Sequence, residues 1–216
     1  MRTVEVGLYS FSELSDEAKE KARDWWREQE SQDFDPEYEP YETAATLLGI
    51  DFDSRQTGTT RAGKAIYQSA IMYSGFYSQG DGASFTGSWS LAPDCCTAIR
   101  KEFPEDTDLH SIADALNAFQ CGTILSQGSR NISAKITQND HHYSHKYTMG
   151  AEVYDADGNE IDADVSESFL EIMRDFAQWI YDKLEADYDY RMSNEVVDDS
   201  IEANEYEFEE DGTFAG

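Results

Sequence analysis

The chain has 216 residues, of which 39% are hydrophobic and 13% aromatic, a composition that supplies a hydrophobic core and excludes disorder of the whole chain. It carries 45 Asp and Glu against 16 Lys and Arg, which gives a formal net charge of -29. A charge of this sign and size excludes nucleic acid and anionic membrane surfaces as direct partners and favours a basic surface on another protein.

The N-terminal sequence predicts a strand followed by two helices. Thr3–Tyr9 alternates between apolar and polar residues in the manner of a strand. Ser15 precedes two acids, which places a capping hydroxyl and negative charge at the start of a helix that should run to about Gln29. A second helix is expected over Glu37–Leu48, with Gly49 as the residue that ends it.

The central sequence predicts a β-rich region and two further helices. Lys64–Tyr77 is rich in Ile, Tyr and Ala, and a Gly-rich turn leads to a second strand at about Ala83–Leu91. Helices are expected near Pro93–Phe103 and at Asp108–Cys121, because the apolar residues of the latter fall on one helical face.

A hairpin and a long helix are predicted in the next part of the chain. Asn131–Thr137 and Tyr143–Tyr154 have strand patterns and are joined by a turn at Gln138–His142, and Asp157-Gly158 is a further turn signal. The longest helix is expected to begin near Asp164, since apolar residues recur there at helical spacing. These residues are Phe169, Met173, Phe176, Ile180 and Leu184.

The chain ends with a predicted acidic helix at about Asn194–Asn204, a strand-like Glu205–Glu209 and a turn at Asp211-Gly212. The elements together predict an α+β fold, with an antiparallel sheet, several packed helices and a long acidic C-terminal helix. We expect an α+β core domain over residues 1–160 and an acidic helical C-terminal region, residues 161–216, packed on that core.

The charge is distributed unevenly along the chain. The formal charge is -9 over residues 1–60, -1 over residues 61–150 and -19 over residues 151–216. The alternative is that the acidity only maintains solubility or suits a high-salt cytoplasm. A general need of this kind would spread the acids more evenly, so the asymmetry favours a dedicated acidic face.

The candidate partner-binding residues are the acids of the C-terminal helices. Carboxylates three or four residues apart stand about 4.5–6 Å apart along a helix axis, while one DNA strand carries a charge about every 3.4 Å. Tyr188 and Tyr190 add aromatic rings that suit arginine-rich grooves. The candidate set is Glu171, Asp175, Asp182, Glu185, Asp187, Asp189, Glu195, Asp198, Asp199 and Glu202.

The Gly-rich stretch Ser74–Gly87 lacks the pattern of a phosphate-binding loop. Phe85 stands where a third glycine is needed, and no Gly-Lys-Ser/Thr follows. A structured hairpin turn is the favoured interpretation, and a polar pocket made by Ser78, Gln79 and Asp81 is the alternative.

The sequence patterns favour neither a metal site nor catalysis. His141, His142 and His145 cluster, but strand alternation would point His142 and His145 to opposite faces. Asp155–Asn159 superficially resembles a calcium loop, yet Gly at position 6 and Glu at position 12 are missing. No G-x-S-x-G marks an activated nucleophile. We expect a protein that is not an enzyme and holds no metal or cofactor.

The chain shows no segment that would place it in a membrane or an oxidising compartment. It has no run of about 18 apolar residues, and its opening MRTVEVGLYS lacks the basic and apolar regions of a signal peptide. Cys95, Cys96 and Cys121 form no even framework, and buried free thiols are favoured over a strained bridge between the first two. We expect a soluble protein of the cytoplasm.

Three stretches are distinctive in combination: ELSDEAKEKAR at Glu13–Arg23, SGFYSQGDGASF at Ser74–Phe85 and ANEYEF at Ala203–Phe208. In these stretches, and over nearly its whole length, the chain resembles a family of acidic bacteriophage and prophage proteins, some labelled antitoxin-like. The resemblance implies a mobile-element origin, where small acidic proteins often disarm host defences, and it supplies no catalytic residues.

The sequence therefore favours a phage-encoded counter-defence inhibitor, of anti-CRISPR or anti-restriction type, that acts as an acidic nucleic-acid mimic in the host cytoplasm. Reversal of Asp182, Glu185 and Asp189 to Lys is expected to abolish inhibition and leave the fold intact. The alternatives are an antitoxin that neutralises a basic toxin and a small-ligand binder or enzyme that uses the Gly-rich loop. The oligomeric state, a homodimer included, stays open.

Overall fold

The computed structural model describes residues 7–128, 131–139 and 143–216, except for the side chain of Asp33. It contains helices and antiparallel sheets, so the expected α+β class is confirmed. The chain forms two compact units: unit 1 is the N-terminal part up to Pro36 together with Leu184–Gly216, and unit 2 is Glu37–Lys183. None of the described helices combines the length and the apolar character needed to cross a membrane.

This division differs from the expected boundary at residue 160. The reason is α5 (Ala163–Arg191), one continuous helix whose residues up to Lys183 belong to unit 2 and whose last turns belong to unit 1. Unit 1 also contains the N-terminal helix, which lies far from it in sequence. Composition changes along the chain do not reveal such a discontinuous unit, because they report on neighbours in sequence and not on packing.

Unit 1 is built from two packed helices and a short antiparallel strand pair. Helix α1 (Asp16–Asp33) begins at the predicted cap, where the Ser15 hydroxyl accepts the Ala18 N–H at 3.3 Å. It packs against α6 (Asn194–Ala203), and β1 (Tyr9–Ser10) pairs with β10 (Glu207–Phe208). The expected strand Thr3–Tyr9 lies largely outside the described residues.

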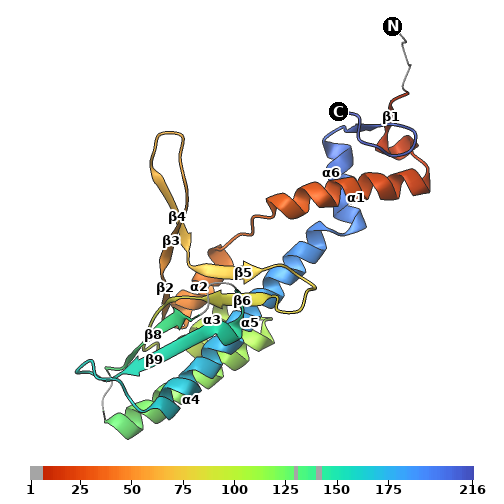
Figure 1. Ribbon diagram of the computed structural model, residues 1–216. Coiled ribbons are helices and arrows are strands. Elements are labelled where there is room, and N and C mark those ends of the chain that lie inside the picture. The colour runs from red at the N-terminus through yellow and green to blue at the C-terminus, as the bar shows by residue number, and fades with distance from the viewer. Residues whose placement is uncertain (1–6, 129–130, 140–142) are drawn as a thin grey trace. The chain divides into compact units, whose positions relative to one another are not determined.

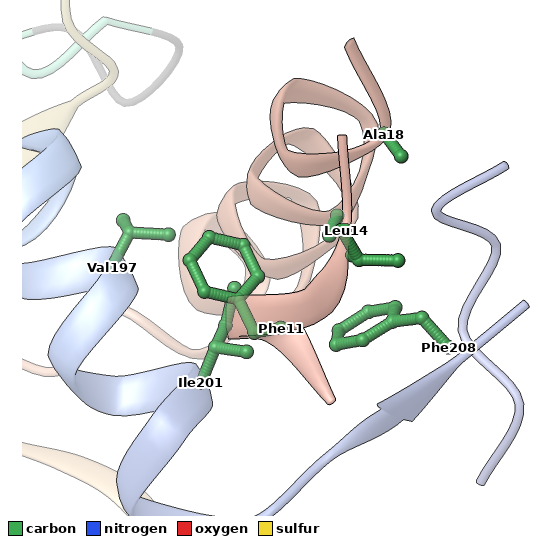
Figure 2. Packing of buried hydrophobic residues seen from close by; sticks show 7 residues of the cluster. Phe11, Leu14, Ala18, Val197, Ile201 and Phe208 are labelled. Carbon is green, nitrogen blue, oxygen red and sulfur yellow. The ribbon is translucent and has the colours of Figure 1, made fainter. Parts of the chain in front are cut away.

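The core of unit 1 joins the two ends of the chain. Figure 2 shows Phe11 and Leu14, around a short 3₁₀ turn at Phe11–Glu13, facing α6 and Phe208. Trp25 stacks on Phe214 with ring centroids 4.0 Å apart, which extends this core. The buried cluster consists of Phe11, Leu14, Ala18, Ala22, Val197, Ile201 and Phe208.

Unit 2 is centred on a four-stranded antiparallel sheet in the order β2-β7-β8-β9. Its strands are β2 (Ile50–Phe52), β7 (Gly87–Ser90), β8 (Ser133–Gln138) and β9 (Met149–Tyr154). One face is apolar because Trp89, Ala134 and Val153 lie in register across it.

Two long helices cover this apolar face. They are α4 (Thr107–Gln127) and α5, which run along the same side of the sheet in Figure 1. The Trp89 ring lies 5.0 Å from Phe169 of α5 and 5.9 Å from Phe119 of α4, measured between centroids. The predicted apolar stripe of α5 is fully buried, which confirms the helical assignment from spacing. Shorter helices α2 (Glu39–Leu47) and α3 (Cys95–Glu102) complete the unit.

Two further strand pairs complete the β structure of unit 2. They are β3 (Ser54–Thr59) with β4 (Ala65–Ser69), and β5 (Ile71–Ser74) with β6 (Gly82–Phe85). The sequence prediction missed β2 and β3. The predicted single strand Ala83–Leu91 is wrong, because Thr86 separates β6 from β7 by bonding to Ala70 and Asp53 and not to a ladder partner.

The predicted hairpin after residue 130 is present, with β8 and β9 antiparallel. However, residues 143–148 are not a strand: His145 caps a 3₁₀ turn at Lys146–Thr148. His145 is therefore not placed on one face of a strand, and His141 and His142 lie outside the described residues. The Asp155–Asn159 turn is confirmed, with the Asp155 N–H donating to the Asn159 carbonyl at 2.9 Å.

The three cysteines are free thiols. Cys95 is buried on α3 and Cys96 is half-buried beside it, whereas Cys121 is exposed on α4.

Candidate binding surface

Most basic residues of unit 1 are neutralised within the unit. Arg23 of α1 donates two charge-assisted hydrogen bonds to the Asp198 carboxylate of α6, from Nε at 2.6 Å and from Nη2 at 2.7 Å. The hydrogen bond to Asp198 raises the pKa of the Arg23 guanidinium above its usual range. Lys21 donates to the Asp211 carboxylate at 2.7 Å, and this contact lowers the pKa of Asp211 below its usual range.

The remaining arginines of the described part of unit 1 are paired in the same way. Arg27 binds Asp24 at 3.0 Å, and Arg191 binds Asp187 at 3.0 Å and lies 3.7 Å from Glu30. Lys19 lies over the Phe11 ring, 5.7 Å from its centroid. The chain segments that form unit 1 carry 22 acids and 6 bases, a formal charge of -16, so pairing leaves a large excess of carboxylate.

The excess is exposed on α6. Glu195, Asp199 and Glu202 recur at helical spacing and are exposed, opposite the buried Val197 and Ile201. None of these three acids forms an ion pair with a described residue. Their spacing of four and three residues places them about 6 and 4.5 Å apart along the helix axis. We call these three residues the α6 acidic stripe.

A hollow of about 410 Å³ lies at one end of the stripe. Its apolar lining comes from Phe11, Ile201 and Tyr206, and its carboxylates are Glu202, Glu205 and Glu207. Ser10 and Ser12 complete the lining, to which no basic residue among those that the structure describes contributes. Aromatic faces beside carboxylates suit a guanidinium or an ammonium group. Glu205 and Glu207 belong to the acidic segment Asn194–Glu210 that the sequence predicts as a phosphate mimic, but not to the candidate residue set, because their alternation indicates a strand and not the rim of a hollow.

The structure divides the predicted partner-binding residues between the two units. Glu171, Asp175 and Asp182 belong to unit 2, and the other seven belong to unit 1. Asp198 and Asp187 are engaged by arginines and thus act in the packing of unit 1. The remaining five residues of the set in unit 1 are Glu185, Asp189, Glu195, Asp199 and Glu202.

The three predicted partner-binding residues in unit 2 also differ in their contacts. Arg174 pairs with Glu171, and the Gln178 amide donates to Asp182 at 2.7 Å. Asp175 and Asp182 line a second hollow of about 280 Å³ together with Asp108 of α4, a residue that the sequence analysis did not select. Only folding brings α4 and α5 together, so no local sequence pattern marks Asp108 as a neighbour of Asp175 and Asp182.

The two tyrosines near the C-terminus of α5 differ in exposure. Tyr190 is 67% exposed, as expected for a residue that meets a partner. Tyr188 is half-buried and packs edge-on against Phe34, with ring centroids 5.4 Å apart. Tyr188 thus contributes to the packing of unit 1.

The Gly-rich loop is held by its own aspartate. The Ser78 N–H donates to the Asp81 carboxylate at 2.6 Å, and a Cβ at Gly75 would come within 3.1 Å of that carboxylate. Gly75 and Tyr77 adopt positive φ angles of 47° and 74° in the same loop. Ser78 and Gln79 are exposed, and none of the hollows described here is lined by the three candidate pocket residues.

Fold and surface together describe an acidic α+β protein that exposes many carboxylates. The chain belongs to a family described as a domain of unknown function, DUF8835, whose model matches residues 34–194. The match includes all of unit 2, whereas most of unit 1, including Glu195, Asp199 and Glu202, lies outside it. No curated protein and no solved structure matches the chain.

Proposed function

We propose that this protein presents the carboxylates of unit 1 to the basic groove of a nucleic-acid-binding protein and thereby blocks that groove. In this role it is a phage-encoded counter-defence inhibitor, of anti-CRISPR or anti-restriction type, that works in the host cytoplasm without catalysing a reaction. The function requires a rigid array of negative charge, because a partner groove is organised around phosphates at fixed positions.

The observation that supports this proposal is the selective pairing of charge in unit 1. Arg23, Arg27 and Arg191 are engaged by acids of their own unit, which fixes the helices. In the described part of the chain, the α6 acidic stripe is left without a positive counterpart. An acidic surface that served solubility alone would not require the bases to be gathered on other acids. The stripe therefore presents uncompensated charge on a helix that is held in place by its own core.

The hollow beside the stripe gives this surface a second element of recognition. An arginine or lysine from the partner would place its charged group among Glu202, Glu205 and Glu207 and its aliphatic stem against Phe11 and Tyr206. Basic residues that normally contact phosphate supply this chemistry. A basic toxin presents the same chemistry. The two roles differ in the partner's affinity for DNA: the main proposal requires a partner that binds DNA at the same groove, and the antitoxin alternative does not.

The test is capture of the partner by the full-length chain. The protein is immobilised, host-cell lysate is applied at about 0.05 M salt, and bound proteins are identified after elution with duplex DNA or with about 0.5 M salt. We expect a basic nucleic-acid-binding protein that both eluents release. A partner that salt releases but DNA does not would contradict the mimicry and favour an antitoxin role.

A matched pair of variants separates the surface from net charge. Replacement of the α6 acidic stripe, E195K/D199K/E202K, should abolish capture. Replacement of three exposed acids of unit 2, D51K/E102K/E105K, changes the net charge equally and should leave capture intact. Equal loss in both variants would show that net charge alone attracts the partner, and equal retention would place the binding surface elsewhere.

A further inference from the structure

The β3–β4 hairpin is distinct from the acidic surface. Figure 1 shows it projecting away from the sheet and helices of unit 2. Within the described residues, β3 and β4 pair with each other and with no other strand. A two-stranded hairpin in water is only marginally stable by itself, and each strand leaves a row of backbone N–H and C=O groups on its outer edge.

The sequence of β4 leaves its outer edge unprotected. Its residues, Ala65-Ile66-Tyr67-Gln68-Ser69, include no charge and no proline, which are the usual protections of an edge strand. The bulge in this hairpin lies on β3, between Gln56 and Gly58. No acid occurs from Ser54 to Gly80, although the chain has a net charge of -29. The stretch does carry Arg55, Arg61 and Lys64, but none of them lies in β4, so β4 itself brings no charge to a strand that pairs with it.

The direction of the backbone groups follows from the ladder. Ala70 donates to the Asp53 carbonyl at one end of the hairpin, and Thr60 donates to the Lys64 carbonyl at the other. Because antiparallel pairs alternate between bonded and non-bonded positions, Gln68 and Ile66 face β3. The N–H and C=O groups of Ala65, Tyr67 and Ser69 then point outward.

We propose that β4 pairs with β4 of a second copy of this chain, antiparallel across a two-fold axis at Tyr67. In this register Tyr67 faces Tyr67 of the second copy, and Ala65 faces its Ser69. Each outward-facing residue on one strand then meets an outward-facing residue on the other, and each pair exchanges both of its N–H···O bonds. The product is a four-stranded sheet in the order β3-β4-β4-β3, an isologous two-fold interface.

Two observations favour a second copy of this chain as the partner that pairs with the outer edge of β4. Tyr67 and Ile66 are 62% and 43% exposed, and pairing at Tyr67 places two aromatic rings side by side on one face of the new sheet. The charges at the two ends of the hairpin are also complementary. Exposed Arg61 and Lys64 lie at the tip, and exposed Asp53 and Glu42 lie at the base, where the Ser69 hydroxyl donates to Glu42. The antiparallel register therefore lays the basic tip of each copy beside the acidic base of the other.

The test is sedimentation equilibrium of the full-length chain over a range of concentrations. The wild type should shift from its monomer mass of 24.5 kDa towards twice that value as concentration rises. The variants Y67K and Y67E each place like charges on the two-fold axis and should weaken dimerisation about tenfold or more. A mixture of the two variants should restore dimers, because Lys then faces Glu.

The mixing result depends on residue 67 facing itself, so it distinguishes this register from a general loss of folding. Y67F retains the aromatic pair and should dimerise like the wild type, and circular dichroism of each variant checks its fold. A wild type that stays monomeric throughout would overturn the proposal, and so would dimers that persist in Y67K or that mixing fails to restore. The dimer should also persist at about 0.5 M salt, which separates it from the salt-sensitive partner surface.

Discussion

At the scale of single residues, a few arginines decide which acids of unit 1 remain exposed for binding. Asp198 and Asp199 are neighbours in sequence, yet one receives a guanidinium across the helix interface and the other faces solvent. The same residue type therefore has opposite roles one position apart. Its role is set by which side of α6 packs against α1.

The Arg23–Asp198 pair should contribute to the stability of unit 1. R23A leaves Asp198 partly buried without its partner and removes a guanidinium that lies 5.6 Å from the Phe11 ring centroid. The expected loss is about 1–3 kcal/mol in the free energy of unfolding, measured by urea denaturation followed through tryptophan fluorescence. The double variant R23A/D198A should lose less than the sum of the two single losses, and strict additivity would show that the pair is not coupled.

Asp106 in unit 2 should make stability depend on pH. It caps α4 by accepting the Leu109 N–H at 3.0 Å, accepts the Trp179 ring N–H at 3.0 Å and pairs with Lys183 at 2.8 Å. Burial raises the pKa of Asp106, but these donors and the Lys183 charge outweigh burial and leave that pKa below its usual value.

Because the folded pKa of Asp106 lies below the unfolded one, its stabilisation is fully present above about pH 4 and is lost as pH falls through the folded pKa. D106N should cost about 1–3 kcal/mol at pH 7, since the amide keeps the shape but loses the charge and an acceptor. The difference in unfolding free energy between wild type and D106N should shrink below pH 4. A difference that stays constant down to pH 2 would contradict this account.

At the scale of elements, helices follow from local signals and strand pairing does not. The cap at Ser15 and the apolar stripe of α5 predicted helices that the structure confirms. The stretch 83–91 was predicted as one strand, since nothing local shows that Ala70 and Asp53 bond to Thr86 and separate β6 from β7. Strand breaks depend on partners that are distant in sequence.

Gly49 is required by both its conformation and its surroundings. It follows α2 with φ at +80°, and a Cβ there would lie 2.2 Å from the Ser90 carbonyl oxygen. Gly128 follows α4 with φ at +65° but has open space around it. G128A should therefore cost only backbone strain, about 1 kcal/mol, whereas G49A should cost clearly more because the chain must also shift. Thermal unfolding of the two variants checks this, and equal costs would contradict the steric argument.

At the scale of the whole molecule, salt should act in opposite directions on folding and on partner binding. The net charge of -29 opposes compaction, and raising salt from about 0.1 M to about 1 M shortens the Debye length from about 10 Å to about 3 Å. The unfolding midpoint should therefore rise with salt while affinity for a basic partner falls.

The variant E195K/D199K/E202K, with a formal charge of -23, provides the comparison for this effect. Its unfolding midpoint should rise less with salt than that of the wild type, because less repulsion remains to be screened. Parallel thermal scans in KCl measure both proteins. A wild-type midpoint that falls with salt would show that attractive ion pairs, such as those of Arg23, outweigh the repulsion.

Local patterns in the sequence suffice for the α+β class, the sign and uneven distribution of charge, and the position of most helices. These properties depend on composition and on neighbours within a few turns, so local patterns report them directly. Packing in three dimensions brings both ends of the chain into one unit and pairs Asp198 while it leaves Asp199 exposed. It also leaves β4 with an open edge. Each of these depends on contacts between residues far apart in sequence, such as Arg23 and Asp198, which lie 175 positions apart.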